Sequence, residues 1–372
     1  MAKIKNFIRQ ELTLCIAFAA ALVSCLFVKP DAQYLEYIDF RTLALLYSLM
    51  VVVAGLRSAG LFSGLAHTLC AKASSVRAMA AILVALCFFS SMLITNDVAL
   101  LTFVPFAVVV LGMAHQEKDL LWVVLLQTVA ANLGSMLTPV GNPQNLFLYS
   151  YYGMGMGRFL LVTGPVWLLS LALIGLACLK FSKGHISVFL GERPELHKKE
   201  LYLYLALFVL CMLVVLRVVD WPLLLLILLP LLFVLDRRTL LEADFLLLVT
   251  FVCFFVFAGN LARIPAVDSV LRRLLAGHEM LLGALASQVI SNVPAALLLS
   301  GFTGQAEALL LGVNIGGLGT PVASLASLIS LKLYSHSENA NTGRYLLFFS
   351  LVNFAMLALL LLAGSALLNV LS

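Results

Sequence analysis

The chain has 372 residues, of which 63% are hydrophobic and 11% are charged, and its mean hydropathy is +1.08. So little polar surface cannot cover a water-soluble core, so the composition excludes an ordinary soluble enzyme or binding domain and indicates a protein embedded in lipid. The net charge of +5 is dispersed over short loops, which argues against a nucleic-acid partner.

Apolar runs recur from one end of the chain to the other and predict an all-α polytopic membrane protein with a single membrane domain, residues 1–372. The runs lie near residues 11–28, 40–56, 159–181, 201–216, 221–235, 245–258 and 345–370. The charged start and first run have the regions of a signal peptide, but no convincing small-residue cleavage site follows Val28. The first run is therefore expected to remain as a helix in a multi-pass protein of the cell's inner or plasma membrane.

The positions of lysine and arginine predict the orientation. If the N-terminus is cytoplasmic, most of the 23 basic residues fall on the cytoplasmic side, as the positive-inside rule requires, and the C-terminus lies outside. Arg272 and Arg273 fall on the outer side, within residues 261–275. Their spacing predicts an amphipathic helix along the membrane interface, where arginine is tolerated.

Two halves of the chain share a local pattern. Residues 93–101 (LITNDVALL) precede residues 132–145 (NLGSMLTPVGNPQN), and residues 289–297 (VISNVPAAL) precede residues 314–327 (NIGGLGTPVASLAS). This pattern predicts two repeats, at about 11–181 and 221–370, joined by a linker helix at about 201–216. Because an odd linker helix reverses the second half, the repeats are expected to be inverted.

Each repeat is expected to contain a re-entrant hairpin and a broken transmembrane helix. The hairpins would lie between Arg77 and Lys118 and between Leu281 and Leu299, each with a polar tip at its centre. The broken helices follow, with glycine and proline in mid-segment: Gly134, Pro139, Gly141 and Pro143, then Gly316, Gly317, Gly319 and Pro321. Such unwound backbone is tolerated at membrane depth only where it is buried in protein or lines a wet cavity.

Half-helix ends and neutral side chains at these interruptions suit an anion or a cation such as sodium. The predicted substrate- and ion-binding residues are Thr95, Asn96, Asp97, Thr138, Gly141, Asn142, Asn145, Ser291, Asn292, Asn314, Gly316 and Thr320. The alternative for the asparagines is structural, since amides also satisfy unwound backbone. No cofactor or dedicated metal site is predicted, and a sodium ion would share the same residues.

Asp97 is the acidic residue expected deep in the membrane, where an ionisable group is a functional hypothesis by default. It would couple transport to a proton or another cation. The alternative is that its carboxylate caps the N-terminus of the second hairpin arm. Both roles are compatible.

The segments ITNDVALLTFVPF and TPVGNPQN resemble the ion transporter superfamily that includes arsenite permeases, citrate and dicarboxylate transporters, and sodium/proton antiporters. The resemblance covers about residues 40–335. It implies a scaffold and a moving transport domain that work by an elevator motion, and its dicarboxylate members imply a homodimer. Those members carry Ser-Asn-Thr at each hairpin tip. Here the tips read Thr95-Asn96-Asp97 and Ser291-Asn292-Val293, and the Asn-Asp pair is closer to arsenite permeases.

These features predict a secondary active transporter of small anions, either carboxylates or inorganic anions, or of a neutral arsenite-type oxyacid, driven by a proton or sodium gradient. The first alternative is a sodium/proton antiporter on the same fold. The second is a membrane-embedded enzyme, which would need clustered histidine, aspartate or glutamate at membrane depth. No such cluster is apparent in the sequence, so the chain is not expected to be an enzyme.

Overall fold

The computed structural model describes residues 11–185, 192–338 and 340–371, and these residues are helical almost throughout. Seven helical segments are long and apolar enough to cross a membrane. They are Ala32–Ser58, Val76–Ile94, Asn96–Met113, Glu117–Leu137, Met156–Cys178, Phe245–Ala262 and Thr342–Leu371. The described residues thus form an all-helical fold, which is consistent with the predicted polytopic membrane protein. Lys3, Lys5 and Arg9, which contribute to the predicted orientation, lie outside the described residues.

The described residues up to 185 form the helices of the first half of the chain. They are α2 (Leu12–Phe27), η1 (Ala32–Leu35), α3 (Phe40–Ser58), α4 (Leu61–Cys70), α5 (Val76–Ile94), α6 (Asn96–Met113), α7 (Glu117–Gly134), η2 (Ser135–Leu137), α8 (Pro143–Tyr151) and α9 (Met156–Cys178). Next come α10 (Lys198–Val215), α11 (Trp221–Leu235) and the short η3 (Thr239–Leu241). The predicted linker at 201–216 therefore corresponds to α10.

The remaining helices have the same kinds of element in the same order as α3 to α9. They are α12 (Phe245–Ala262), α13 (Pro265–Leu275), α14 (Glu279–Ile290), α15 (Asn292–Ser300), α16 (Ala306–Ile315), η4 (Pro321–Ala323), α17 (Leu325–Ser335) and α18 (Thr342–Leu371). Of the residues of α13, only Leu275 is buried, and Arg272 pairs with Asp268 at 2.8 Å on its surface. This exposed amphipathic helix lies within the segment where the sequence predicts one.

Both hairpin tips have the same unusual backbone. Thr95, between α5 and α6, has φ 69° and ψ 151°, and Ser291, between α14 and α15, has φ 72° and ψ 155°. A positive φ is uncommon for residues with a side chain and marks a locally strained turn. Each tip residue is followed directly by an asparagine that begins the next helix.

The arms of the two hairpins differ in length. α15 has 9 residues, which at 1.5 Å per residue is too short to cross a hydrocarbon core of roughly 30 Å. α5 and α6 have 19 and 18 residues and each reach spanning length by size and composition. The first hairpin is therefore longer than a re-entrant arm needs to be.

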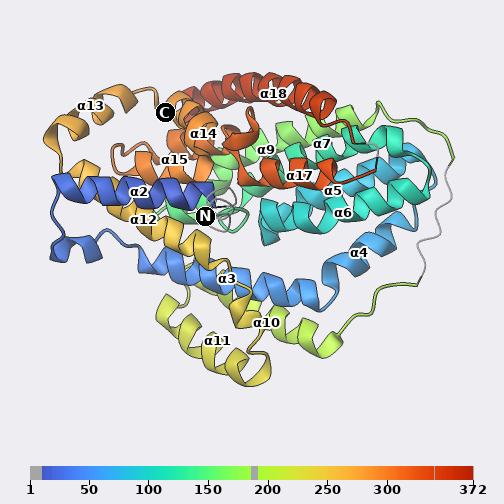
Figure 1. Cartoon of the computed structure of the whole chain (residues 1–372), viewed down its shortest axis with the longest axis horizontal. Helices are drawn as coiled ribbons and strands as arrows, with labels where there is room; N and C mark the ends of the chain where they lie inside the picture. The colour runs from blue at the N-terminus through green and yellow to red at the C-terminus, as the bar shows by residue number, and fades with distance from the viewer. Residues whose placement is uncertain (1–10, 186–191, 339, 372) are drawn as a thin grey trace, which may run out of the picture.

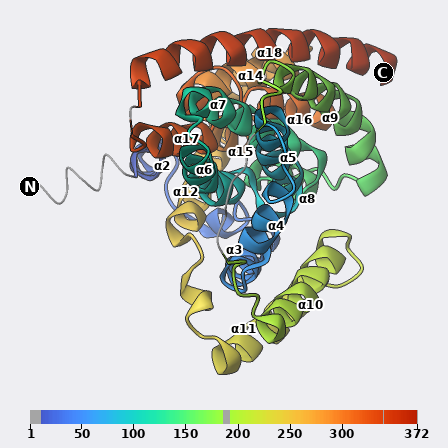
Figure 2. The same cartoon turned by 90° about the vertical axis from the view of Figure 1, so that its right-hand side faces the viewer.

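The helices surround the two hairpin tips in layers. Figure 1 shows α10 and α11 at one edge of the molecule, beside α3, and the long α18 at the opposite edge. Figure 2 shows α18 extending across the top of the bundle, over α7 and α14. In between, α5 packs against α7, and α2 packs against α12. The hairpins and interrupted helices thus lie between α3 and α18.

Candidate functional site

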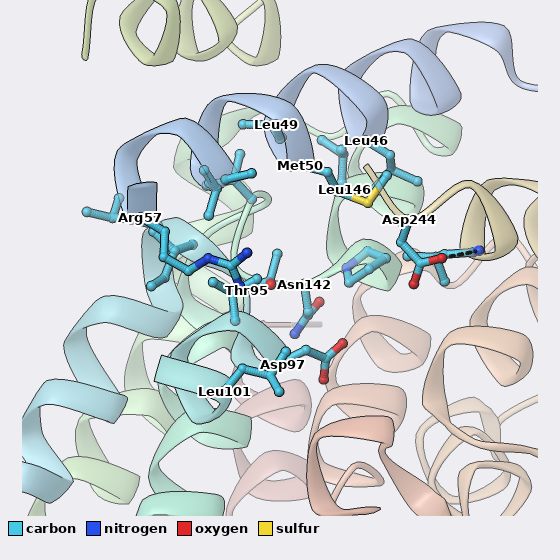
Figure 3. Close-up of a pocket in the computed structure, with 18 of the residues that line it drawn as sticks. Leu46, Leu49, Met50, Arg57, Thr95, Asp97, Leu101, Asn142, Leu146 and Asp244 are labelled. Atoms are coloured by element: carbon cyan, nitrogen blue, oxygen red, sulfur yellow. Dashed lines mark hydrogen bonds between the residues drawn. The ribbon is translucent and has the colours of Figure 1, made fainter. Parts of the chain in front are cut away.

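A cavity of about 240 Å³ lies where α3, the first hairpin tip and the start of α12 meet. Its walls are mostly leucine, isoleucine, valine and methionine from α3, α5, α6, α8 and α17. The polar side chains on its lining are Arg57, Thr95, Asp97, Asn142, Glu242 and Asp244. Figure 3 labels all of these except Glu242 and shows them facing the cavity from different sides, with Asp97 and Asn142 close to its centre.

Asp97 lies in the first turn of α6 and its Oδ1 atom is buried. This atom makes no hydrogen bond to any residue that the structure describes, and the N-cap position of α6 has no side-chain hydrogen bond. The backbone N–H of Asp97 instead donates to Oδ1 of Asn96 at 3.0 Å. A carboxylate in the first turn still interacts favourably with the helix dipole, but Asp97 does not form the hydrogen-bonded cap that the sequence suggests as an alternative.

Asn132, at the end of α7, links the first hairpin tip to α17. Its Oδ1 accepts hydrogen bonds from Nδ2 of Asn96 at 3.1 Å and from Oγ of Ser324 at 2.8 Å. Its Nδ2 donates to Oγ of Ser327 at 3.2 Å. All four side chains are at least 96% buried. These contacts fix the tip asparagine in the buried scaffold behind the cavity, so its amide is not free to bind a ligand.

Asn314, at the end of α16, makes the corresponding contacts with α8. Its Nδ2 donates to Oδ1 of Asn145 at 2.6 Å, and its Oδ1 accepts from Nδ2 of Asn142 at 3.2 Å. The Oδ1 of Asn142 in turn accepts from the backbone N–H of Asn145 at 3.0 Å and so caps α8. Because Pro143 lacks an N–H and occupies the first position of α8, the sequence GNP favours a helix start at this point.

The unwound segment between η2 and α8 is held against the first hairpin. The N–H of Asn96 donates to the carbonyl of Gly141 at 3.2 Å, and Thr138 Oγ1 donates to the carbonyl of Met92. A Cβ atom at Gly141 would overlap the carbonyl of Ser135. Asn145 Nδ2 lies within 3.3 Å of the carbonyls of Ser135, Met136 and Thr138. This amide therefore satisfies backbone groups that the interruption leaves without helical partners.

The second interruption is held by Gln288, which the sequence analysis does not single out. Gln288 Nε2 donates to the carbonyls of Gly316 and Leu318 at 2.8 and 2.9 Å, and its Oε1 accepts from the N–H of Thr320 at 2.8 Å. Thr320 Oγ1 donates back to the Gln288 carbonyl at 3.1 Å. A polar residue one turn before the tip, in an otherwise apolar hairpin arm, is the sequence signal that would identify it.

The second tip lies against the second interruption. Ser291 Oγ donates to the carbonyl of Ala323 at 3.4 Å. A Cβ atom at Gly317 would lie 3.0 Å from Nδ2 of Asn292 and 3.9 Å from Oδ1 of Asn132, so both amides lie beside this glycine. At Gly316 a Cβ atom would lie 2.7 Å from Cα of Ala284. Both glycines allow close backbone packing.

The predicted site residues thus fall into two groups. Thr95, Asp97 and Asn142 line the cavity, whereas the remaining ones form the buried scaffold behind it or around the second tip. Arg57, Glu242 and Asp244 line the cavity as well but are absent from the sequence-based list of site residues, and the sequence-based orientation only places Arg57 on the cytoplasmic side. Among the described residues, no group of three or more histidine, cysteine, aspartate or glutamate side chains is arranged to hold a metal ion.

Comparison with known proteins identifies the family. The family model described as Citrate transporter (CitMHS) matches residues 7–308. The chain belongs to this family. An uncharacterized transporter of Methanocaldococcus jannaschii is 32% identical over 318 residues, which cover 85% of this chain and 86% of that protein. The inner membrane protein YbiR of Escherichia coli is 30% identical over 347 residues, or 90% and 89% of the two chains.

A shorter match joins this citrate transporter family member to a silicon efflux transporter of Oryza sativa subsp. japonica. The two are 33% identical over 125 residues, which cover 32% of this chain and 24% of that protein. The resemblance to the ion transporter superfamily is confirmed by the family match, and the chain is a membrane transporter and not an enzyme.

Proposed function

We propose that this citrate transporter family member is a secondary active transporter of small anions or neutral oxyacids, driven by a proton or sodium gradient. The observation that carries the proposal is that one cavity is lined both by Asp97, whose buried Oδ1 has no hydrogen-bond partner among the described residues, and by the guanidinium of Arg57. A cavity with both a cation-binding and an anion-binding group suits the joint transport of two ions.

The charges on the cavity wall supply a physical reason for coupling. Asp97, Glu242 and Asp244 contribute carboxylates, while Arg57 contributes a guanidinium. With all four groups ionised, the wall has an excess of negative charge and repels an anion, most strongly where the surroundings are apolar. A proton or sodium ion on Asp97 lowers that repulsion. Binding of the cation therefore favours binding of the anion, which is the thermodynamic basis of symport.

We also propose that the two halves are inverted repeats. The sequence pattern aligns Asn132 with Asn314, and it aligns Asn142 and Asn145 with Ser324 and Ser327. Asn132 bonds to Ser324 and Ser327, whereas Asn314 bonds to Asn142 and Asn145. Such reciprocal contacts are what a pseudo-twofold axis between the repeats produces. The equal backbone angles at Thr95 and Ser291 further support this arrangement.

The proposed location is the inner or plasma membrane, in line with the inner membrane protein YbiR as a relative. The distribution of basic residues favours a cytoplasmic N-terminus and an outer C-terminus. On this topology, Arg57 and Glu242 are cytoplasmic, and the cavity opens inward. An elevator movement of both hairpins and both interrupted helices against α3 and α12 would then expose the cavity outward. A homodimer that anchors the scaffold completes the proposal.

Either of two substrate classes accounts for the polar groups. The family description names citrate, a carboxylate, and the guanidinium on the cavity suits carboxylates and inorganic anions. The relative named for silicon favours neutral oxyacids, which need hydrogen bonds but no charge. The second candidate function is a sodium/proton antiporter, which the presence of both Asp97 and Asp244 on the cavity favours.

The test is flux in proteoliposomes that contain the purified full-length protein. Citrate, succinate, sulfate and arsenous acid are offered under an imposed proton gradient or an imposed sodium gradient. Uptake of one solute that follows one gradient supports the proposal and identifies the coupling ion. Sodium/proton exchange that is independent of every solute supports the antiporter, and the absence of all these fluxes contradicts both functions.

A further inference from the structure

The only basic side chain among the residues that line the described cavity is that of Arg57. It lies in the last turn of α3, and Figure 3 shows its side chain extending from α3 toward the cavity, on the same side as Thr95. A helix C-terminus favours a cation, so this position stabilises the guanidinium even where its contact with an acidic side chain is weak.

The acidic partner of Arg57 is held loosely. One Nη2 atom of Arg57 lies 3.4 Å from Oε2 of Glu242, and the two side chains are 47% and 42% exposed. By contrast, Arg263 holds Asp31 through two nitrogens, at 3.1 and 2.7 Å. An exposed single contact of this kind contributes little to stability. It leaves most of the guanidinium donors available for another acceptor.

We propose that Arg57 is the residue that recognises the negative charge of the substrate, and that Glu242 competes with the substrate for it. This inference deepens the proposed anion transport and rests on it. The ligand class is a carboxylate or an inorganic oxyanion, which presents two oxygens to the planar guanidinium. The other carboxylates on the cavity, Asp97 and Asp244, repel the same ligand. Arg57 therefore provides the attraction, and Asp97 provides the dependence on the coupling cation.

The proposal and a purely structural ion pair predict different changes in KM for two substitutions. Arg57→Gln and Glu242→Gln both break the pair, so a purely structural role predicts the same effect from each. If Glu242 competes for Arg57, the two effects are opposite. Arg57→Gln raises the KM for the anion about tenfold or more, because a charge-assisted hydrogen bond is lost. Glu242→Gln lowers the KM severalfold, because the guanidinium no longer has a competing partner.

The experiment measures initial rates of citrate, succinate and sulfate uptake in proteoliposomes for the wild type, both single variants and the double variant. Arg237→Gln serves as the matched control, since Arg237 is exposed, lies before η3 and does not line the cavity. We expect the double variant to behave like Arg57→Gln. Replacing Glu242 has no effect on anion binding once the guanidinium for which it competes is gone. Yield and monodispersity in detergent check that each variant is folded.

Three results separate the proposal from the function on which it rests. Equal shifts of KM in both single variants, or none in Arg57→Gln, overturn the role of Arg57 and leave anion transport intact. A wild type that carries arsenous acid, which is uncharged at neutral pH, but none of the anions also overturns the role of Arg57, while the oxyacid form of the proposed function remains. A wild type without solute flux contradicts the proposed function itself, and the Arg57 proposal with it.

Discussion

Asn314 donates a hydrogen bond from Nδ2 to Oδ1 of Asn145 at 2.6 Å, although 169 positions separate them in the sequence. The contact joins the two interrupted helices at the point where each has stopped making its own backbone hydrogen bonds. Together with the contacts of Asn132, it forms a continuous buried polar network behind the cavity. In such networks each amide is fixed by its neighbours, so loss of one leaves several groups without partners.

Replacement of Asn314 by alanine is expected to lower stability by about 1–3 kcal/mol, since buried Oδ1 of Asn145 loses its donor and Nδ2 of Asn142 loses one of its two acceptors. Asn132→Ala is expected to have an effect of similar size because its contacts are reciprocal. The measurement is thermal unfolding of the purified protein in detergent. Asn353→Ala is the comparison, since Asn353 donates only to the carbonyl of Phe349 in its own helix. Equal effects of all three variants would contradict a special role for the network.

Gly134 and Gly112 are expected to respond to alanine with opposite signs. A Cβ atom at Gly134 would overlap the carbonyl of Phe88, whereas one at Gly112 would meet nothing within 4 Å. Gly134→Ala should therefore destabilise the protein by about 1–3 kcal/mol through overpacking. Gly112→Ala should be neutral or stabilise the protein by up to about 1 kcal/mol. Melting temperatures of the two variants, compared with the wild type, provide the test, and a shift in the same direction for both would refute the packing argument.

Gln288→Leu is expected to abolish solute flux while the protein still inserts and purifies. The substitution keeps most of the side-chain volume but leaves the N–H of Thr320 and the carbonyls of Gly316 and Leu318 without Gln288 as their partner. Three lost hydrogen bonds at an unwound segment should shift it away from its present path. Ser365→Ala, which loses one bond to Leu361 on the exposed side of α18, should keep its flux. A fully active Gln288→Leu variant would show that the second interruption does not depend on this amide.

Lys180 provides a prediction about pH outside the membrane-spanning segments. Although Lys180 is exposed overall, partial desolvation lowers the pKa of its ammonium group from 10.5 to about 8, against an opposing effect of Asp119. Its Nζ lies over the ring of Trp122. Because the folded-state pKa lies below the unfolded value, protonation disfavours the folded state. Stability attributable to this residue is therefore lowest below pH about 8 and rises up to pH about 10.5.

The test for Lys180 is the melting temperature of the wild type and of Lys180→Met between pH 7 and pH 10. We expect the wild type to gain stability relative to the variant as the pH rises through this range. A difference between them that does not change with pH would contradict the lowered pKa.

Much of the architecture is predictable from local sequence. Glycine and proline between Gly134 and Pro143 predict the first interruption because they weaken or block the helix, and the tips coincide with the polar breaks at Asn96 and Asn292. The network is harder to predict. Alignment of the repeats pairs Asn132 with Asn314, but apart from Asn96 their side-chain partners lie in the opposite half. Only the packing of the two halves brings those partners together.

The cavity was predictable only in part, for a related reason. Asp97 and Asn142 stand out because polar groups are costly in lipid, whereas Arg57, Glu242 and Asp244 are charged residues near helix ends. Such residues look like ordinary loop charges until α3 and α12 are placed beside the first hairpin. Gln288 stands out in the sequence only as a polar residue in an apolar hairpin arm. Its partners are backbone groups about 30 residues away, and the sequence does not identify them.

The measurement that tests the central claim most directly compares gradient-driven uptake with anion counterflow in proteoliposomes containing wild type or Asp97→Asn. Asparagine keeps the shape of the side chain and mimics its neutral form, so the variant should still exchange anions across the membrane. It should fail to accumulate them against a gradient, because it no longer binds the coupling cation. Unchanged gradient-driven accumulation by Asp97→Asn would contradict the account.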